Sequence, residues 1–220
     1  MRLLYPTTTT TTAATAKESQ SSDTITVAKG DAAATGLADE DLFALVREKA
    51  DEQAFRTLYR RYDKRLFAYC LRAMKTRESA EDVFQSVMTL VFEKRASFSG
   101  GSFAAWLFTI ARNQTLNHKQ KQRITTDIDD IAYSISDESD RTGEDVLLSD
   151  ALKKAISSLP EEFREPLELK HFDGFQYEEI ADMLKISLSL AKVRVFRAKK
   201  MLHEALKPYL RELKPDDNSE

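Results

Sequence analysis

Basic side chains recur at helical spacing near the end of this sequence, in residues 188–201, where no acidic residue occurs. At 100° per residue, one group falls on a common side of the helix: Ser189, Val193, Phe196, Arg197 and Lys200, with Lys192 and Lys199 on one flank. Arginine and lysine can reach guanine or phosphate, and apolar side chains can contact thymine methyl groups. The pattern therefore favours a helix that binds in the DNA major groove.

The other side of this predicted helix is apolar at three- and four-residue steps. Its residues are Leu188, Ala191, Val195, Ala198, Leu202 and Ala205. A short helix is predicted over 176–184, and the turn over 185–187 ends at Ser187, a residue type that caps helices. A short helix, a tight turn and a longer basic helix are typical of a helix-turn-helix. An amphipathic helix with a merely solvated basic face is the alternative.

The sequence contains no recognisable pattern of residues for catalysis or for metal binding. Adjacent acids occur at 129–130, 161–162 and 178–179, which are linker or helix N-terminal positions. The histidines are isolated, and Cys70 falls on an apolar helix face, where a buried thiol is expected. The sequence has no glycine loop of the phosphate-binding type. We therefore expect no enzyme activity, no metal and no cofactor.

The first half of the chain carries the apolar periodicity of three helices. The stripes of these helices begin near Phe55, Ala80 and Phe103. Between the second and third helices, the segment 97–102 contains two adjacent glycines and is predicted as a loop whose backbone could approach an extruded base. Trp106 falls on the third stripe, so we expect it in the core.

Charge is distributed unevenly along the chain, although the net charge is only -3. Residues 39–123 contain 16 Lys and Arg against 11 Asp and Glu, and residues 150–214 contain 13 against 11. Residues 124–149 contain one Arg and eight acidic residues, which DNA would repel. The pattern predicts two mildly basic blocks separated by an acidic one.

The expected fold is all-α, with two small helical domains joined by a flexible acidic linker. The expected boundaries are a disordered Thr-rich lead over 1–38, a helical domain over 39–123, a linker over 124–146, a helix-turn-helix domain over 147–214 and an acidic tail over 215–220. A fully extended linker of this length could span at most ~75 Å. One chain could therefore hold two DNA sites about two helical turns apart.

Composition favours the cell interior. Hydrophobic residues make up 42% of the chain and charged residues 31%, as in soluble helical proteins. Neither a membrane-spanning apolar run nor a secretion signal is visible, and a single cysteine excludes an internal disulfide framework. The expected location is the cytoplasm, without membrane insertion.

Both helical blocks resemble the small two-domain sigma factors of the extracytoplasmic-function (ECF) group, within the sigma-70 family. In the first block the resemblance lies in residues 79–85 (SAEDVFQ) and 103–113 (FAAWLFTIARN). In the second it lies in residues 159–165 (LPEEFRE), 177–181 (YEEIA), Lys192 and 194–198 (RVFRA). It covers roughly residues 39–210, in the order and spacing of the family.

This resemblance implies a role for each domain. The first, family region 2, would bind the clamp of core RNA polymerase and open the downstream promoter element. The second, family region 4, would bind the upstream promoter element and touch the polymerase flap. The polymerase-binding residues are expected to be Asp82, Gln85, Ser86 and Thr89. The DNA-binding residues are expected to be Arg112, Asn113, Thr115, Asn117 and Lys119 in the first domain and Ser187, Ser189, Lys192, Val193, Arg194, Phe196, Arg197 and Lys200 in the second.

The resemblance also implies the partners. They would be core RNA polymerase and promoter DNA, with one copy of the chain in the holoenzyme. An anti-sigma factor is a further candidate partner, because the group acts under stress or envelope signals.

The sequence departs from the family pattern at several positions. Ser86 stands where the family often has Glu, Asn117 where Asp is common, and Lys185 where the turn usually has Gly. A left-handed backbone at Lys185 would carry a small penalty. Residues 190–194 (LAKVR) replace the usual Thr-Val-Lys-Ser-Arg, so no base preference is carried over. Pro166 lies in a predicted helix that it should kink unless it falls within the first turns.

Two other classes of protein stay open at this point. A stand-alone helix-turn-helix regulator would bind duplex DNA without polymerase, usually as a dimer. The whole first block and the lack of an evident dimerisation helix count against it. An adaptor that kept the fold but lost promoter binding is the other class, and the departures at Lys185 and Val193 leave room for it.

Overall fold

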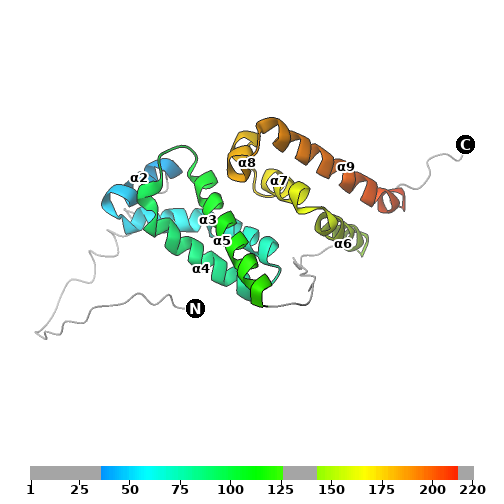
Figure 1. Cartoon of the computed structure of the whole chain (residues 1–220), viewed down its shortest axis with the longest axis horizontal. Helices are drawn as coiled ribbons and strands as arrows, with labels where there is room; N and C mark the ends of the chain where they lie inside the picture. Colours follow the sequence, from blue (N-terminus) through cyan, green and yellow to red (C-terminus); the bar gives the residue numbers. More distant parts are fainter. Residues whose placement is uncertain (1–35, 126–142, 213–220) are drawn as a thin grey trace, which may run out of the picture.

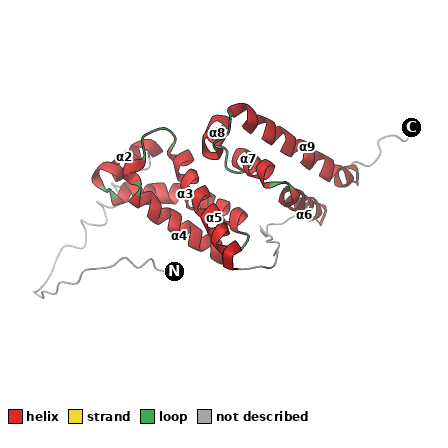
Figure 2. Cartoon of the chain, viewed as in Figure 1, coloured by secondary structure: helices red, strands yellow, loops and turns green. Residues whose placement is uncertain are grey.

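The structure is a computed structural model and describes residues 36–125 and 143–212. Within these residues the regular elements are eight α-helices and one 3-10 helix, which confirms the predicted all-α class (Figure 2). Most of the predicted lead, the central part of the predicted linker and the acidic tail lie outside the described residues. None of the described helices has both the length and the apolar character that crossing a membrane requires.

The first group of helices comprises α2 (Asp39–Lys49), α3 (Glu52–Met74), α4 (Arg77–Glu93) and α5 (Phe103–Thr125), with the short η1 (Arg95–Ser97) before the glycine loop (Figure 1). Aromatic side chains fill the core between α2 and α5. The ring centroid of Phe43 lies 4.6 Å from that of Phe103 and 5.1 Å from that of Trp106. Trp106 therefore packs against the core, as its position on the stripe predicts.

A break between α2 and α3 has no counterpart in the apolar periodicity. Ala50 ends α2 in the left-handed conformation, with φ of 50°. Asp51 then caps α3 by accepting a hydrogen bond of 2.9 Å from the backbone N–H of Ala54. Alanine rarely adopts the left-handed conformation, because its Cβ causes a steric penalty there. The alanine at position 50 therefore did not predict a turn. The N-cap aspartate was the available signal.

The second group of helices comprises α6 (Gly143–Ser158), α7 (Glu161–His171), α8 (Tyr177–Leu184) and α9 (Leu188–Glu212). Helices α8 and α9 form the predicted helix-turn-helix. The hydroxyl of Ser187 accepts a hydrogen bond of 3.2 Å from the N–H of Leu190, which confirms Ser187 as the cap. Lys185 adopts the left-handed conformation, with φ of 54°, so the turn forms without a glycine. Helix α6 begins four residues before the expected domain boundary at 147.

The apolar side of α9 is buried only in its middle. Ala191, Val195 and Ala198 are buried, and Leu202 packs partly against them. Leu188 is 37% exposed and Ala205 is exposed, so the predicted stripe is too long at both ends. Helix α9 has 25 residues and packs against α6, α7 and α8.

The two groups of helices are packed against each other, which the prediction of two tethered domains does not include. Phe108 of α5 and Phe175, just before α8, are both buried, and their ring centroids lie 5.0 Å apart. Ile180 of α8 belongs to the same buried cluster as the core of the first group. In Figure 1, the ribbons of α7 and α8 accordingly lie next to α3 and α5. One apolar core therefore continues across both groups.

Candidate nucleic-acid interface

The outer side of α9 is exposed over three turns. Its exposed residues are Ser189, Lys192, Val193, Phe196, Arg197 and Lys200, and Ser187 is exposed just before them. We call these seven residues the α9 face. Arg194 is half-buried, because its guanidinium reaches Glu162 of α7 at 3.4 Å. Burial of the opposite side of α9 fixes the direction in which the α9 face points. The α9 face therefore lies on the solvent side of the helix.

Apolar side chains sit in the middle of the α9 face. Phe196 is 69% exposed and Val193 is 42% exposed, between the cations of Lys192 and Arg197. Exposed apolar groups ringed by polar ones are typical of a binding surface. Thymine methyl groups are suitable partners for them in a major groove.

The outer side of α4 presents a polar patch beside an aromatic ring. Its members are Asp82, Gln85, Ser86 and Thr89, all exposed, and we call them the α4 patch. Phe92 beside it is 37% exposed. Val83, Val87 and Val91 on the opposite side of α4 are buried, so the patch faces away from the core, as its position on the helix predicts. Its binding partner stays a prediction.

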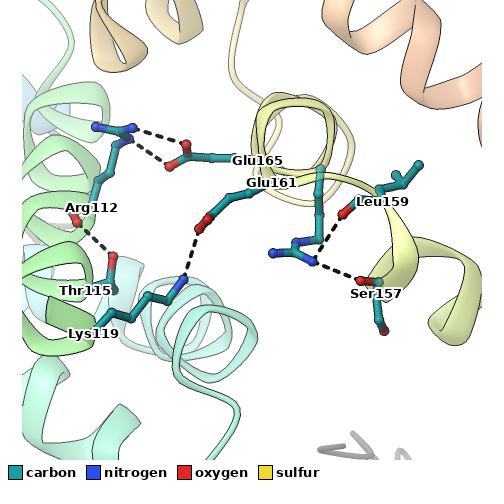
Figure 3. Close-up of polar contacts among 8 residues, drawn as sticks. Arg112, Thr115, Lys119, Ser157, Leu159, Glu161 and Glu165 are labelled. Carbon is teal, nitrogen blue, oxygen red and sulfur yellow. Dashed lines mark hydrogen bonds and ion pairs between the residues drawn. The ribbon is translucent and has the colours of Figure 1, made fainter. Parts of the chain in front are cut away.

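The predicted DNA-binding residues of α5 are divided between exposed and paired side chains. Asn113 and Asn117 are exposed. Arg112 instead forms two hydrogen bonds with Glu165 of α7, from Nε to Oε1 at 2.7 Å and from Nη2 to Oε2 at 3.2 Å (Figure 3). Lys119 pairs with Glu161 of α7 at 3.2 Å. Two of the predicted phosphate-binding cations are therefore held by carboxylates of the second group of helices.

Electrostatics favour the charged form of the Arg112 side chain in this pair. Burial alone would lower the pKa of Arg112, but the hydrogen bond and the charge of Glu165 outweigh it and raise the pKa above its usual value. A two-point arginine–carboxylate pair of this kind is among the stronger polar contacts in proteins.

The structure places Thr115 differently from the prediction. Its side chain is buried, with 3% of the residue exposed, and its hydroxyl donates a hydrogen bond of 2.8 Å to the carbonyl oxygen of Arg112. Thr115 follows the buried Ala111 by four residues, which puts it on the apolar side of α5. It therefore supports the helix and is not placed to contact DNA.

An ion pair joins α3 to the loop after α7, and the sequence did not predict it. Nη2 of Arg72 lies 2.7 Å from both carboxylate oxygens of Asp173. Burial raises the pKa of Asp173, and the neighbouring Arg72 opposes that rise. Asp173 follows Arg72 by 101 positions and stands in a segment that reads as a simple helix end, so no sequence signal pointed to the pair.

A second arginine of α3 lies between two aromatic rings at the same contact. The guanidinium of Arg65 is 4.8 Å from the ring centroid of Phe108 and 4.7 Å from that of Phe175. It also donates a hydrogen bond to the backbone carbonyl of Asp173. Cation–π contacts with two rings hold the loop before α8 against α3 and α5.

The glycine loop between η1 and α5 is exposed and needs its glycines. Gly100 and Gly101 have φ of 107° and 84°, a conformation that other residues rarely adopt. Neither glycine has an atom within 4 Å of the position that a Cβ would take, so backbone conformation and not crowding requires them. The loop therefore presents open backbone at the N-terminus of α5.

Within residues 36–125 and 143–212, no group of three or more His, Cys, Asp or Glu side chains is arranged to hold a metal ion. Cys70 is buried in the core of the first group, and burial raises the pKa of its thiol to about 12. A thiol of this kind is a packing group.

Comparison with known proteins identifies one family region in each of the two groups of helices. Residues 58–124 match the family described as Sigma-70 region 2, and residues 149–202 match the family described as Sigma-70, region 4. The ECF RNA polymerase sigma-E factor of Escherichia coli is 29% identical over 192 residues, which cover 80% of this chain and 97% of that one. The RNA polymerase sigma-H factor of Pseudomonas aeruginosa is 28% identical over 178 residues, which cover 75% and 92%.

Solved structures agree in fold. The sigma factor RpoE of Bartonella quintana, in complex with the anti-sigma factor NepR, has a TM-score of 0.58 and 27% identity, and the match covers 70% of this chain and 96% of that one. CnrH, in complex with the cytosolic domain of CnrY, has the same TM-score at 22% identity and supports the fold alone. The order of the two matched regions and the near-complete coverage of the relatives lead to one conclusion. This chain belongs to the extracytoplasmic-function group of the sigma-70 family of RNA polymerase sigma factors.

Proposed function

We propose that this protein is a transcription initiation factor that binds core RNA polymerase, directs it to promoters and catalyses no reaction itself. The observation that carries the proposal is the α9 face, which combines exposed cations and exposed apolar side chains on the second helix of a helix-turn-helix. Such a face can read base edges and hold phosphates in a major groove. Core RNA polymerase is proposed as the partner because the chain belongs to the sigma-70 family.

The two groups of helices would have different binding roles. The α9 face would bind the upstream promoter element, with Arg197 and Lys200 among its cations. The α4 patch would bind core polymerase. The outer side of α5, with Arg112, Asn113, Asn117 and Lys119, would contact the downstream element as it opens, next to the exposed glycine loop. This assignment excludes Thr115 because its side chain is buried.

Regulation by an anti-sigma factor in the cytoplasm is the second part of the proposal. One structural relative, the sigma factor RpoE of Bartonella quintana, forms a complex with the anti-sigma factor NepR. A partner of this kind would link promoter use to a stress or envelope signal. The protein would act as one copy in the holoenzyme.

Transcription in vitro tests the proposed function. The full chain is added to core RNA polymerase on genomic promoter fragments, and the start sites of the transcripts are mapped. Specific initiation that depends on the chain supports the proposal. Binding of duplex DNA without polymerase, together with no initiation, would identify a stand-alone regulator, and neither activity would identify an adaptor.

A further inference from the structure

Helix α2 contacts both ends of the glycine loop, residues 98–102. At the start of the loop, the guanidinium of Arg47 donates a hydrogen bond of 3.3 Å to the backbone carbonyl oxygen of Phe98. At its end, the carboxylate of Glu40 accepts a hydrogen bond of 3.0 Å from the backbone N–H of Phe103, the first residue of α5. Helix α2 accordingly lies beside η1 and the start of α5 (Figure 1). One helix therefore holds the chain on both sides of the loop.

An aromatic contact lies between these two hydrogen bonds. Phe43 of α2 is buried, and its ring centroid lies 5.2 Å from that of Phe98 and 4.6 Å from that of Phe103. Glu40, Phe43 and Arg47 are three and four residues apart, so they share one side of α2. Both ends of the loop therefore rest on one ring of α2, with one polar contact at each end.

Helix α2 is itself fixed to α3 through the residue next to Glu40. The carboxylate of Asp39 accepts hydrogen bonds from the guanidinium of Arg61 and from the hydroxyl of Tyr62, both on α3. The apolar side of α2 is also buried in the core. A movement of α2 relative to α3 would break these contacts, so α2 can act as a rigid support for the loop.

The contacts leave residues 99–101 as the tip of the loop. Ser102 is tied to α5, because its hydroxyl accepts a hydrogen bond of 3.2 Å from the N–H of Ala105. Residues 99–101 are exposed, and the two glycines among them have open space on the side where a Cβ would lie. A loop with fixed ends loses less conformational entropy on binding a ligand than a loop that must first be ordered.

We infer that Glu40 and Arg47 are positioning residues for promoter opening, which hold the glycine loop in the conformation that receives an extruded base of the downstream element. The inference rests on the proposed function, because that function brings the downstream element to α5 and the adjacent loop. Neither side chain contacts DNA in this role. Both act through backbone atoms of the chain, at Phe98 and Phe103, and so through the fixed ends of the loop.

Transcription on two matched templates tests this role with the full chain and core polymerase. One template is a duplex promoter fragment on which the unchanged chain directs initiation, and the other has the same sequence with a mismatched, already open downstream element. On the duplex, the affinity of the first complex and the rate of opening are measured separately, the rate with a fluorescent base analogue in the downstream element. The variants are Glu40→Ala, Arg47→Ala and the double variant Glu40→Ala/Arg47→Ala.

We expect the double variant to open the duplex about ten-fold more slowly, because the two hydrogen bonds no longer fix the loop. Each single variant should show a smaller decrease in the same rate. The affinity of the first complex should be unchanged, since it depends on the α9 face and the upstream element. Initiation from the mismatched template at saturating holoenzyme should also be unchanged, because its strands are already separated. A general loss of structure in the first group of helices would lower all of these quantities together.

Two conservative variants provide matched controls. Glu40→Gln keeps a side-chain oxygen that can accept the hydrogen bond from Phe103, so it should open the duplex at nearly the rate of the unchanged chain. Glu48→Gln removes the charge of the other partner of Arg47, which lies 3.1 Å from it, and leaves the hydrogen bond to Phe98 in place. This second variant should leave the opening rate unchanged.

The outcomes separate the positioning role from the proposed function. An unchanged opening rate in the double variant overturns the positioning role. An equal loss on both templates, or a loss confined to the affinity of the first complex, overturns it as well, because the defect would then lie in folding or binding. In these cases the proposed function stands, since the unchanged chain still directs initiation. If the unchanged chain directs no initiation on either template, the proposed function fails, and the positioning role fails with it.

Discussion

The two predicted DNA-binding surfaces differ in what they contact in the free protein. The α9 face consists of exposed side chains, among them the cations of Lys192, Arg197 and Lys200. The outer side of α5 has the same residue chemistry, but Arg112 and Lys119 are held by Glu165 and Glu161. Residue type therefore defines which ligand a surface can bind, and tertiary contact defines whether the surface is free to bind it.

The same contrast appears within α7. Glu161 and Glu165 form pairs across the contact to α5, whereas Glu162 between them pairs with Arg194 of its own group. Three acids within five residues thus stabilise two different contacts. Their sequence spacing reflects the sides of α7 that they occupy.

The largest effect is expected at the α9 face. The double variant Arg197→Ala/Lys200→Ala should lower affinity for the upstream element roughly 100-fold, because each cation contributes about 1–3 kcal/mol to a DNA contact. Holoenzyme binding to promoter fragments measures this effect. Association with core polymerase should be unchanged.

Lys207→Ala is the matched control for this prediction. Lys207 lies on the same helix but pairs with Glu204 in its last turns, away from the α9 face. Equal promoter use by the double variant and the unchanged protein would show that the α9 face does not read the promoter.

A smaller effect is expected at the α4 patch, which is exposed like the α9 face but polar. Gln85→Ala should weaken binding to core polymerase about five-fold, the loss of about 1 kcal/mol that is typical of one interface residue. Titration of the chain against core polymerase measures it. Glu78→Gln, at the exposed start of α4, is the control. Unchanged affinity in Gln85→Ala would remove the patch from the polymerase interface.

A still smaller effect is expected at Arg112, although it has the same chemistry as Arg197. Arg112 exchanges Glu165 for a phosphate when DNA binds, so only the difference between two ion pairs contributes to affinity. Arg112→Ala should therefore change promoter affinity by about 0.6 kcal/mol or less, which is about three-fold or less. Filter binding of a promoter fragment to the free chain, in which the pair with Glu165 is present, measures it. A loss as large as that of the α9 double variant would mean that α5 is free before DNA arrives.

The sequence predicts the helix-turn-helix well because its signals are local. The stripe through Ala191, Val195 and Ala198 and the cap at Ser187 depend on residues within a few turns of each other. The Arg72–Asp173 pair joins positions 101 residues apart across the linker, and no local pattern encodes such a contact. Thr115 is an intermediate case, because its place four residues after Ala111 was a local sign of burial.

The helix-turn-helix also allows a test on stability alone. Lys185 ends α8 in the left-handed conformation, which costs a side-chain-bearing residue more than it costs glycine. Lys185→Gly should therefore raise the free energy of unfolding by about 0.5–1 kcal/mol, part of the relief being offset by the greater chain entropy of glycine when unfolded. Urea unfolding measures it, and Lys185→Ala, which removes the charge but keeps the Cβ, is the control.

Promoter affinity should not follow this change in stability. The backbone of the turn already has the conformation that glycine favours, so Lys185→Gly leaves Ser187 and the α9 face in place. An equal gain in stability from Lys185→Ala would show that charge at this position, and not backbone conformation, sets the cost of the turn. Loss of promoter binding in both Lys185→Gly and Lys185→Ala would instead make the lysine side chain part of the DNA contact, which would extend the exposed surface of the second group of helices beyond α9.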